Sequence, residues 1–293
     1  MTWVLLSLAS AVFVAARYLY IKRFCRGVGS GAVVFVTRAV GSLVLLPPTL
    51  GKSIYIGSPA VFWPILLLTA VLTMAATIAT MRIVQRDPLS GSIPYLSFIP
   101  IFMVPWTLLF FKEMPSTPAF AGVVLTCAGA YLLNIRAGMS FWEPFRIIAA
   151  HRVPRYMLPV AVVLGLTTAC DRIAIASSTA LSYTFLWTAV SALLTGITVA
   201  KHNGTGTLIS SLKNPHVVAQ AVIWAGGFYG QMAAVQAALP IDSGVTYVKT
   251  LTMTSILFTV IGGGALLKER GPLRGILASA LMVGGAILVV VAR

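Results

Sequence analysis

Acidic residues are scarce in this sequence: six Asp and Glu stand among 293 residues, and charged residues of both signs make up only 9% of the chain. Ordinary soluble domains carry roughly 25% charged residues. So few charges cannot cover a surface that faces water, whereas 58% of the residues are hydrophobic. The folded chain is therefore expected to expose most of its surface to lipid.

Cysteine is rare, and recognisable catalytic motifs are missing. Cys25, Cys127 and Cys170 are odd in number and scattered, with neither a disulfide framework nor a metal-ligand spacing. The three histidines fall between apolar runs, and no HExxH, GxSxG or P-loop pattern occurs. These absences argue against a hydrolase, a metalloenzyme and an ATP-driven pump. They predict a protein that is not an enzyme and needs no cofactor.

Positive charge, in contrast, is in excess, with a formal net charge of +15. The basic residues lie in short gaps between apolar runs and not together on one polar face, which argues against nucleic acid as a partner. Basic loops of membrane proteins fix orientation and contact anionic headgroups. Membrane lipids are therefore expected partners.

Successive apolar runs of about 20 residues are each long enough to cross the hydrocarbon core as a helix. The sequence thus predicts an all-α, polytopic membrane protein with ten transmembrane helices. The first run begins at Thr2 without a basic segment before it, which predicts a retained span and not a cleaved signal peptide. Pro94, Pro100 and Pro105 predict a bent or interrupted fourth span. The spans are placed at residues 2–21, 31–50, 60–82, 90–111, 118–135, 156–175, 180–200, 216–238, 243–266 and 272–292.

The chain repeats itself at about half its length. Lys112-Glu113 at the end of the fourth span recurs as Lys268-Glu269 at the end of the ninth, 156 residues later. An odd number of spans in each half inserts the halves in opposite orientations, a plan found in secondary transporters. The sequence therefore predicts two inverted five-helix repeats, 1–135 and 156–293. Further matches pair Gly129-Ala130 with Gly285-Ala286 at the same spacing, and Arg17 with Arg172 and Asp87 with Asp242 at a spacing of 155.

The segment between the repeats, residues 136–155, is the longest connection. Ser140 and Glu143 form a capping-box pattern that predicts the start of a helix. Phe141, Phe145 and Ile148 then share one face, which predicts an amphipathic helix on the membrane surface. The alternative is a plain polar linker.

The distribution of Lys and Arg predicts orientation. If the spans alternate, fourteen basic residues fall on one side and three on the other, so the positive-inside rule places both termini outside the cytoplasm, in a bacterial or archaeal inner membrane. The first set is Lys22, Arg23, Arg26, Arg82, Arg86, Arg136, Arg146, Arg152, Arg155, Lys201, Lys213, Lys268, Arg270 and Arg274, and the second is Lys52, Lys112 and Arg293.

Two basic residues lie deep inside predicted spans, Arg38 in the second and Lys249 in the ninth. Charges in spans are costly and usually line a cavity or pair with one another. A cavity with two fixed cations favours an anionic or zwitterionic solute, so both residues are candidates for substrate binding. The alternative is that they tie helices together through backbone carbonyls.

Three further charged residues, Arg17, Asp171 and Arg172, lie near the ends of the first and sixth spans. An interfacial ion pair is one interpretation, and coupling or gating is the other. A proton-driven antiporter needs a carboxylate that alternately holds a proton and a substrate. With Asp171 as the single candidate, proton coupling, facilitated diffusion and exchange all stay open.

Several aromatic and polar side chains lie within spans. Tyr183 and Tyr247 fit the interfacial aromatic belt. Gln231 would be costly if it faced lipid, so it is expected either to line the cavity or to form hydrogen bonds between helices. The candidates for lining the substrate cavity are Tyr95, Trp187, Tyr229 and Gln231.

The pattern resembles the drug/metabolite transporter superfamily, EamA type. The resemblance covers the whole chain and is carried by "FVTRAVGSLVLLP", "LLFFKEMPSTPAFAGVVLTCAGAYLLN" and "GGALLKERGPLRGILASALMVGGAILVVV". It implies a central cavity between spans 1–4 and 6–9, with spans 5 and 10 outside on a face that could form a homodimer, so a monomer or a homodimer is expected. It also implies export of amino acids and other metabolites, or exchange of sugar phosphates and nucleotide sugars. Many bacterial members keep their termini in the cytoplasm, which differs from the charge-based orientation above.

The leading hypothesis is a secondary transporter or exporter of small metabolites, amino acids or related organic anions and zwitterions, by alternating access. A second transport hypothesis is a flippase for an anionic lipid-linked headgroup. Hypotheses of a different class are an intramembrane enzyme and a sensory membrane protein.

Overall fold

The computed structural model describes residues 1–51, 54–132, 152–267 and 275–292, and the regular elements among them are helices. The predicted all-helical fold is therefore confirmed for this part of the chain. In chain order the elements are α1 (Thr2–Phe24), α2 (Ser30–Leu50), α3 (Pro59–Arg86), α4 (Leu89–Ser92), the 3₁₀ helix η1 (Ile93–Phe98), α5 (Ile99–Phe111), α6 (Thr117–Leu132), α8 (Arg152–Ala176), α9 (Ala180–Asn203), α10 (Thr205–Leu212), α11 (Pro215–Ala238), α12 (Gly244–Thr252), α13 (Ser255–Leu267) and α14 (Gly275–Val291).

The chain is an integral membrane protein by the length and composition of its helices. Seven helical segments of the described residues are long and apolar enough to cross a membrane: Thr2–Phe24, Ser30–Leu50, Pro59–Arg86, Ile93–Phe111, Val153–Ala176, Ala180–Asn203 and Gly244–Leu266. Two shorter apolar helices are Thr117–Leu132 and Ala278–Val291. A helix lies in each of the ten predicted spans, but α11 is not among the seven. It carries one His and three Gln side chains among its apolar residues.

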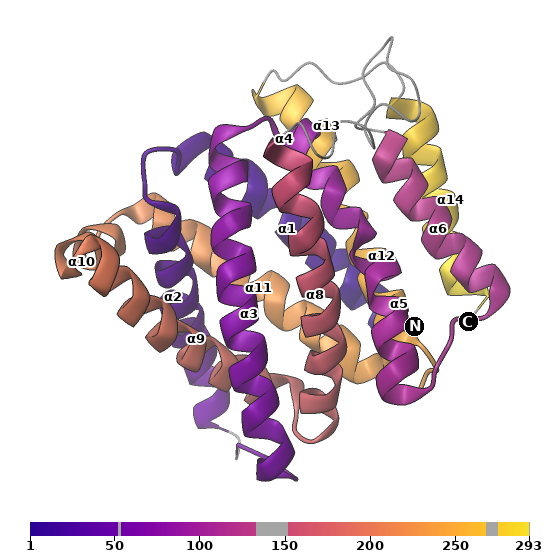
Figure 1. The fold of residues 1–293 in the computed structure, drawn as a ribbon, viewed down its shortest axis with the longest axis horizontal. Coiled ribbons are helices and arrows are strands. Elements are labelled where there is room, and N and C mark those ends of the chain that lie inside the picture. Colours follow the sequence, from indigo (N-terminus) through magenta and orange to yellow (C-terminus); the bar gives the residue numbers. More distant parts are fainter. Residues whose placement is uncertain (52–53, 133–151, 268–274, 293) are drawn as a thin grey trace.

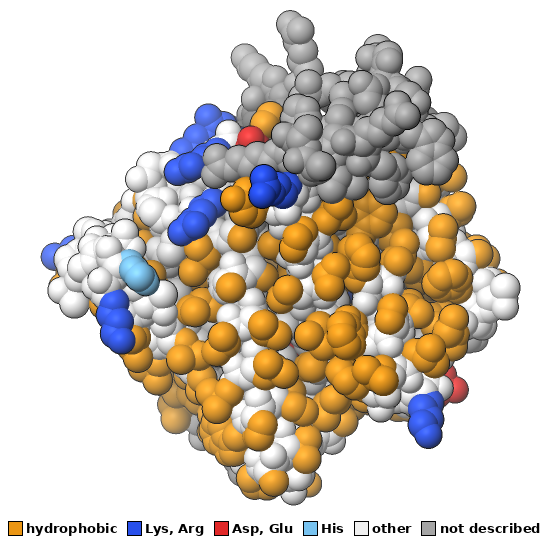
Figure 2. All heavy atoms as spheres, viewed as in Figure 1, with side chains coloured by type: hydrophobic (Ala, Val, Ile, Leu, Met, Phe, Trp, Pro, Cys, Tyr) orange, Lys and Arg blue, Asp and Glu red, His pale blue; other side chains and the backbone are white. Residues whose placement is uncertain are grey.

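The surface of the molecule exposes many apolar side chains, unlike the surface of a soluble protein. Large hydrophobic side chains are widely exposed, among them Leu43, Leu67, Leu109, Leu193 and Ile261. Figure 2 shows that hydrophobic side chains cover the middle of the visible face, while Lys and Arg gather toward its margins. Exposed apolar surface of this extent is stable only where lipid covers it.

Helices α6 and α14 pack side by side at one edge of the bundle, with the N- and C-terminal ends of the chain on the same side (Figure 1). Small residues allow this close approach. A Cβ atom added at Gly122 would lie 2.7 Å from the carbonyl oxygen of Gly285, and one at Gly129 would lie 2.7 Å from that of Ala278. The remaining helices form the larger body beside this pair.

The fourth predicted span is broken, as its prolines predict. It consists of α4, the 3₁₀ helix η1 and α5, with Pro94 near the start of η1, Pro100 near the start of α5, and Pro105 inside it. The ninth span is interrupted too, since α12 ends at Thr252 and α13 begins at Ser255. No proline in this span predicts the interruption. The broken segments contact each other, α12 against α5 and α13 against η1.

Candidate functional site

A cavity of about 160 Å³ lies inside the bundle. Its walls come from α1, α2, α3, η1, α5, α8, α9, α11, α12 and α13, so both halves of the chain build it. The outer helices α6 and α14 contribute no lining residue among those described. The broken segments η1, α12 and α13 all border this space.

Four charged side chains line the cavity: Arg17, Arg38, Asp171 and Lys249. Three cations thus share the space with a single carboxylate. In the described part of the chain, none of the three cations lies within 4 Å of the Asp171 carboxylate. The charges are close enough to interact through space, but they do not form contact ion pairs.

Arg38, from α2, lies against two neighbouring indole rings, whose centroids are 6.5 Å apart. Its guanidinium carbon lies 4.3 Å from the ring centroid of Trp187 and 4.4 Å from that of Trp224. Its Nη2 donates to the Thr77 hydroxyl at 3.3 Å, and its Nε has no hydrogen-bond partner among the described residues. The side chain is only 3% exposed. The indole faces stabilise the buried cation and leave the edge of the guanidinium to make hydrogen bonds.

Arg17, from α1, lines the same cavity and forms no ion pair with an acidic side chain of the described residues. Its side chain is 7% exposed, and its Nε donates to the amide oxygen of Gln220 at 3.2 Å. The Gln220 amide group in turn donates to the Thr37 hydroxyl at 2.8 Å. Because these partners are neutral, they orient the guanidinium without neutralising it. The position of Arg17 therefore favours a role at the cavity over an interfacial ion pair.

Asp171, from α8, is oriented by a chain of hydrogen bonds. The Tyr183 hydroxyl donates to its carboxylate Oδ1. The Tyr183 hydroxyl also lies 3.3 Å from the Thr69 hydroxyl, to which the Trp187 indole N–H donates at 3.1 Å. The same tryptophan therefore contacts Arg38 and belongs to the network that holds Asp171. Tyr183 is fully buried in the protein, so its assignment to the interfacial belt is wrong.

Lys249 reaches the cavity from the last turn of the short helix α12, immediately before the break at Met253-Thr254. Asp171 is the carboxylate whose charge acts on the ammonium group. Because Lys249 lies next to an interruption of its span, its position depends on where α12 ends.

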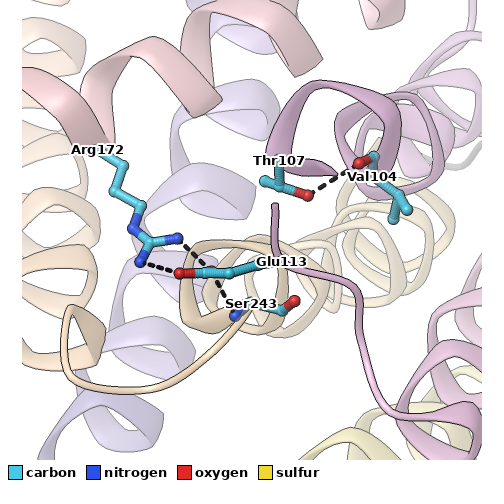
Figure 3. A network of polar contacts seen from close by, with 5 residues as sticks. All are labelled: Val104, Thr107, Glu113, Arg172 and Ser243. Atoms are coloured by element: carbon cyan, nitrogen blue, oxygen red, sulfur yellow. Dashed lines mark hydrogen bonds and ion pairs between the residues drawn. The ribbon is translucent and has the colours of Figure 1, made fainter. Parts of the chain in front are cut away.

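Arg172 follows Asp171 in α8, but it points to a different partner (Figure 3). Its guanidinium donates to both carboxylate oxygens of Glu113, at 2.5 and 2.7 Å, and its carbon lies 4.2 Å from the ring centroid of Phe111. The backbone N–H of Ser243, just before α12, donates to the same carboxylate at 2.7 Å. This clamp of Arg172, Glu113 and Ser243 joins the end of α5 to α8 and to the start of α12. Arg172 is therefore one half of an ion pair outside the cavity.

Hydrogen bonding governs the acidity of Glu113. Burial raises the pKa of its carboxyl, but the hydrogen bonds from Arg172 and Ser243, together with the guanidinium charge, outweigh burial and leave the pKa below its ordinary value. The carboxylate is therefore ionised and paired at neutral pH.

Of the predicted lining residues, the structure brings Trp187 and Gln231 to the cavity, together with Arg38 and Lys249. Tyr95 does not line it and is buried in a hydrophobic cluster. Tyr229 is 38% exposed on the outside of the bundle. Neither tyrosine lines this cavity, and a role of Tyr95 or Tyr229 in substrate binding stays a prediction. Two other expectations, the amphipathic helix predicted within 136–155 and the Lys268-Glu269 dipeptide, involve residues 136–151 and 268–269, which lie outside the described residues.

Sequence reasoning missed a row of hydroxyl groups on the cavity wall. Thr73, Thr77 and Thr80 of α3 face the cavity, as do Thr167 and Thr168 of α8. Their spacing of four and three along α3 places them on one helix face. This periodicity was visible in the sequence, and it gives the cavity neutral donors and acceptors beside its charges.

The chain is similar to a known protein family and to a solved structure. The family model described as "EamA-like transporter family" matches residues 1–135. A solved structure titled "Crystal structure of protein" is similar with a TM-score of 0.72 and 15% sequence identity, covering 99% of this chain and 98% of that chain. At that identity the likeness shows a shared fold. No curated protein matches the sequence.

Proposed function

Residues 1–135 belong to the EamA-like transporter family, and from this premise we propose a specific transport function for the whole chain. The family is part of the drug/metabolite transporter superfamily, and its members are membrane transporters of small molecules. The protein is a secondary transporter or exporter of amino acids or related small organic anions and zwitterions. It works by alternating access to the cavity that holds Arg38, Lys249 and Asp171.

The observation that carries this proposal is the charge inside the cavity. Three cations face one carboxylate, and they are surrounded by aromatic rings and hydroxyl groups. A charge buried without a partner is strongly destabilising. A solute with an anionic group supplies the missing charge, so the cavity favours it over a neutral or cationic solute of the same size.

The size of the cavity narrows the substrate class. Its volume of about 160 Å³ is close to that of an engineered cavity of about 150 Å³ that binds benzene. Amino acids and small carboxylates have this order of size, whereas nucleotide sugars are far larger. The proposed substrate is therefore a small metabolite with few heavy atoms.

The proposed architecture is ten spans in two inverted repeats, 1–135 and 156–293, joined by the linker 136–155. Helix contacts support it. If α1, α3 and α6 correspond to α8, α11 and α14, the packing of α1 on α11 exchanges with that of α8 on α3, and α6 on α14 exchanges with itself.

The close approach of α6 and α14 supports the same symmetry. Adding 156 to Gly122 and Gly129 gives Ala278 and Gly285. The observed contacts join Gly122 to Gly285 and Gly129 to Ala278. Exchanging the halves turns one contact into the other, as a two-fold relation between repeats requires.

The proposed location is a bacterial or archaeal inner membrane with both termini outside the cytoplasm, in keeping with the excess of basic residues at the opposite ends of the spans. We expect Lys213→Cys to be protected from a membrane-impermeant maleimide in intact cells, and Met114→Cys to be labelled. The native cysteines are buried and provide a low background. Both sites are exposed on the protein itself. Labelling of Lys213→Cys with protection of Met114→Cys would reverse the orientation.

Counterflow in proteoliposomes tests the function itself. Vesicles preloaded with a single unlabelled amino acid or organic anion are expected to accumulate the same labelled solute, without an imposed ion gradient. Vesicles reconstituted with the Lys249→Ala variant are expected to accumulate at least about tenfold less, because one cation of the cavity is lost. A panel of small anions and zwitterions that never shows counterflow would contradict the proposal. Movement of a labelled lipid-linked headgroup between leaflets would instead favour a flippase.

A further inference from the structure

We propose that Arg17 and Arg38 together form a subsite for one oxyanion group, a carboxylate or a phosphate, of the transported solute. The inference rests on the proposed transport function, and it adds a residue of the first span to the binding site. The oxyanion accepts hydrogen bonds from two guanidinium edges, one supplied by α1 and one by α2.

Unused hydrogen-bond donors carry this inference. The Nη2 of Arg17 and the Nε of Arg38 are buried nitrogens without a hydrogen-bond partner among the described residues. Both side chains are more than nine-tenths buried, and both line the cavity. A buried donor on a charged group that lacks a partner is costly. Two arginines that line one cavity and that each carry such a donor point to a ligand that accepts from both.

A shared wall keeps the two guanidinium groups near the same part of the cavity. The guanidinium carbon of Arg17 lies 5.8 Å from the ring centroid of Trp224, and that of Arg38 lies 4.4 Å from it. Trp187 and Trp224 are neighbouring rings, with centroids 6.5 Å apart, that both contact the Arg38 guanidinium. Its Nε donor, on the guanidinium edge, has no partner among the described residues, and this edge is the part of arginine that binds carboxylate and phosphate.

The distribution of charge points to the same place. Asp171 acts through space on both Lys249 and Arg38, so one carboxylate serves more than one cation of the cavity. The hydrogen-bond partners of Arg17 and Arg38 are the side chains of Gln220 and Thr77, which are neutral. The cavity therefore keeps a net positive charge, and an oxyanion between the two arginines relieves their mutual repulsion.

Thermal stabilisation of the full-length protein in detergent tests the subsite. The probes are pyruvate, inorganic phosphate and ethanolamine, each titrated at constant ionic strength. Pyruvate or phosphate is expected to raise the Tm of the wild type, because a ligand stabilises the state that binds it, and ethanolamine is expected to have no effect. The order of the two anions distinguishes a carboxylate subsite from a phosphate subsite.

Variants of Arg17 connect the stabilisation to this site. Arg17→Lys keeps the charge but loses the planar fork, and it is expected to raise the apparent Kd for the anion about tenfold, with a larger increase in Arg17→Gln. The matched control is Arg23→Gln, which removes an exposed arginine two turns further along the same helix. It is expected to retain the wild-type Kd.

Three results would overturn the subsite: no stabilisation of the wild type by either anion, an unchanged Kd in Arg17→Lys, or an equal loss in Arg23→Gln. If Arg17→Gln does not fold, Arg17→Lys alone decides. Failure of the subsite and failure of the transport function are distinguishable. Counterflow that persists while Arg17→Lys binds anions normally removes only the subsite. Anion binding that depends on Arg17, without counterflow of any solute, removes the transport function and keeps the subsite.

Discussion

Replacing Arg38 by Ala is expected to lower the rate of anion counterflow about 100-fold while leaving the protein folded. This residue places a cation in the cavity, and its Nε donor has no hydrogen-bond partner among the described residues. Truncating one partner of a buried, hydrogen-bonded charge pair costs roughly 2–5 kcal/mol, and about 2.7 kcal/mol corresponds to a factor of about 100. Initial rates in proteoliposomes, normalised to the amount of reconstituted protein, measure the effect.

Two further variants separate charge from geometry at this position. Arg38→Lys keeps the cation but loses the planar guanidinium that lies against the rings of Trp187 and Trp224, so an intermediate loss of about tenfold is expected. Arg82→Ala removes an exposed arginine of α3 and serves as the control that should retain activity. Wild-type rates in both Arg38 variants would show that the cavity cation has no part in transport.

Replacing Glu113 by Gln is expected to destabilise the protein by about 2–3 kcal/mol. The side chains of Arg172 and Glu113 are only 11% and 16% exposed. Removing one partner of a fully buried ion pair costs about 3–5 kcal/mol because the other charge stays buried and unpaired, and the partial exposure here reduces that cost. Denaturation in detergent measures the difference in the free energy of unfolding.

A double-mutant cycle tests whether the loss comes from the ion pair. The Glu113→Gln and Arg172→Gln double variant is expected to be less destabilised than the two single losses added together, because neither charge is left without its partner. Additive losses would mean that the two side chains stabilise the protein independently of each other. Transport by the double variant separately tests the coupling or gating role proposed for Arg172.

The stability contributed by Glu113 also depends on pH. The pKa of this carboxyl is lower in the folded protein than its ordinary value. Its contribution is therefore fully present above the pKa of the unfolded chain and is lost as the pH falls through the folded pKa. The gap in stability between wild type and Glu113→Gln should narrow on acidification in that window. A gap that stays constant from neutral pH into the acid range would contradict this assignment.

The sequence by itself determined the membrane class, the helical fold and the presence of costly charges inside it. Six acidic residues in 293 cannot support a water-exposed surface, and a backbone in lipid must satisfy its own hydrogen bonds. Pro94, Pro100 and Pro105 predicted the break in the fourth span. The depth of Arg38 and Lys249 in their spans predicted a cavity. A cation inside a membrane is costly however the helices are arranged, so it is expected to line a cavity or to have a partner.

Only the tertiary structure decided which face of each helix looks inward. Arg17 and Arg172 occupy matching positions of the sequence repeat, yet one lines the cavity and the other clamps Glu113. Tyr229 and Gln231 lie two residues apart in α11, and Gln231 lines the cavity while Tyr229 is largely on the outer surface. In a soluble protein the apolar face of a helix marks the interior. In a membrane protein both lipid and core are apolar, so hydrophobicity does not separate the faces, and the neighbours of each side chain are known only once the helices are packed.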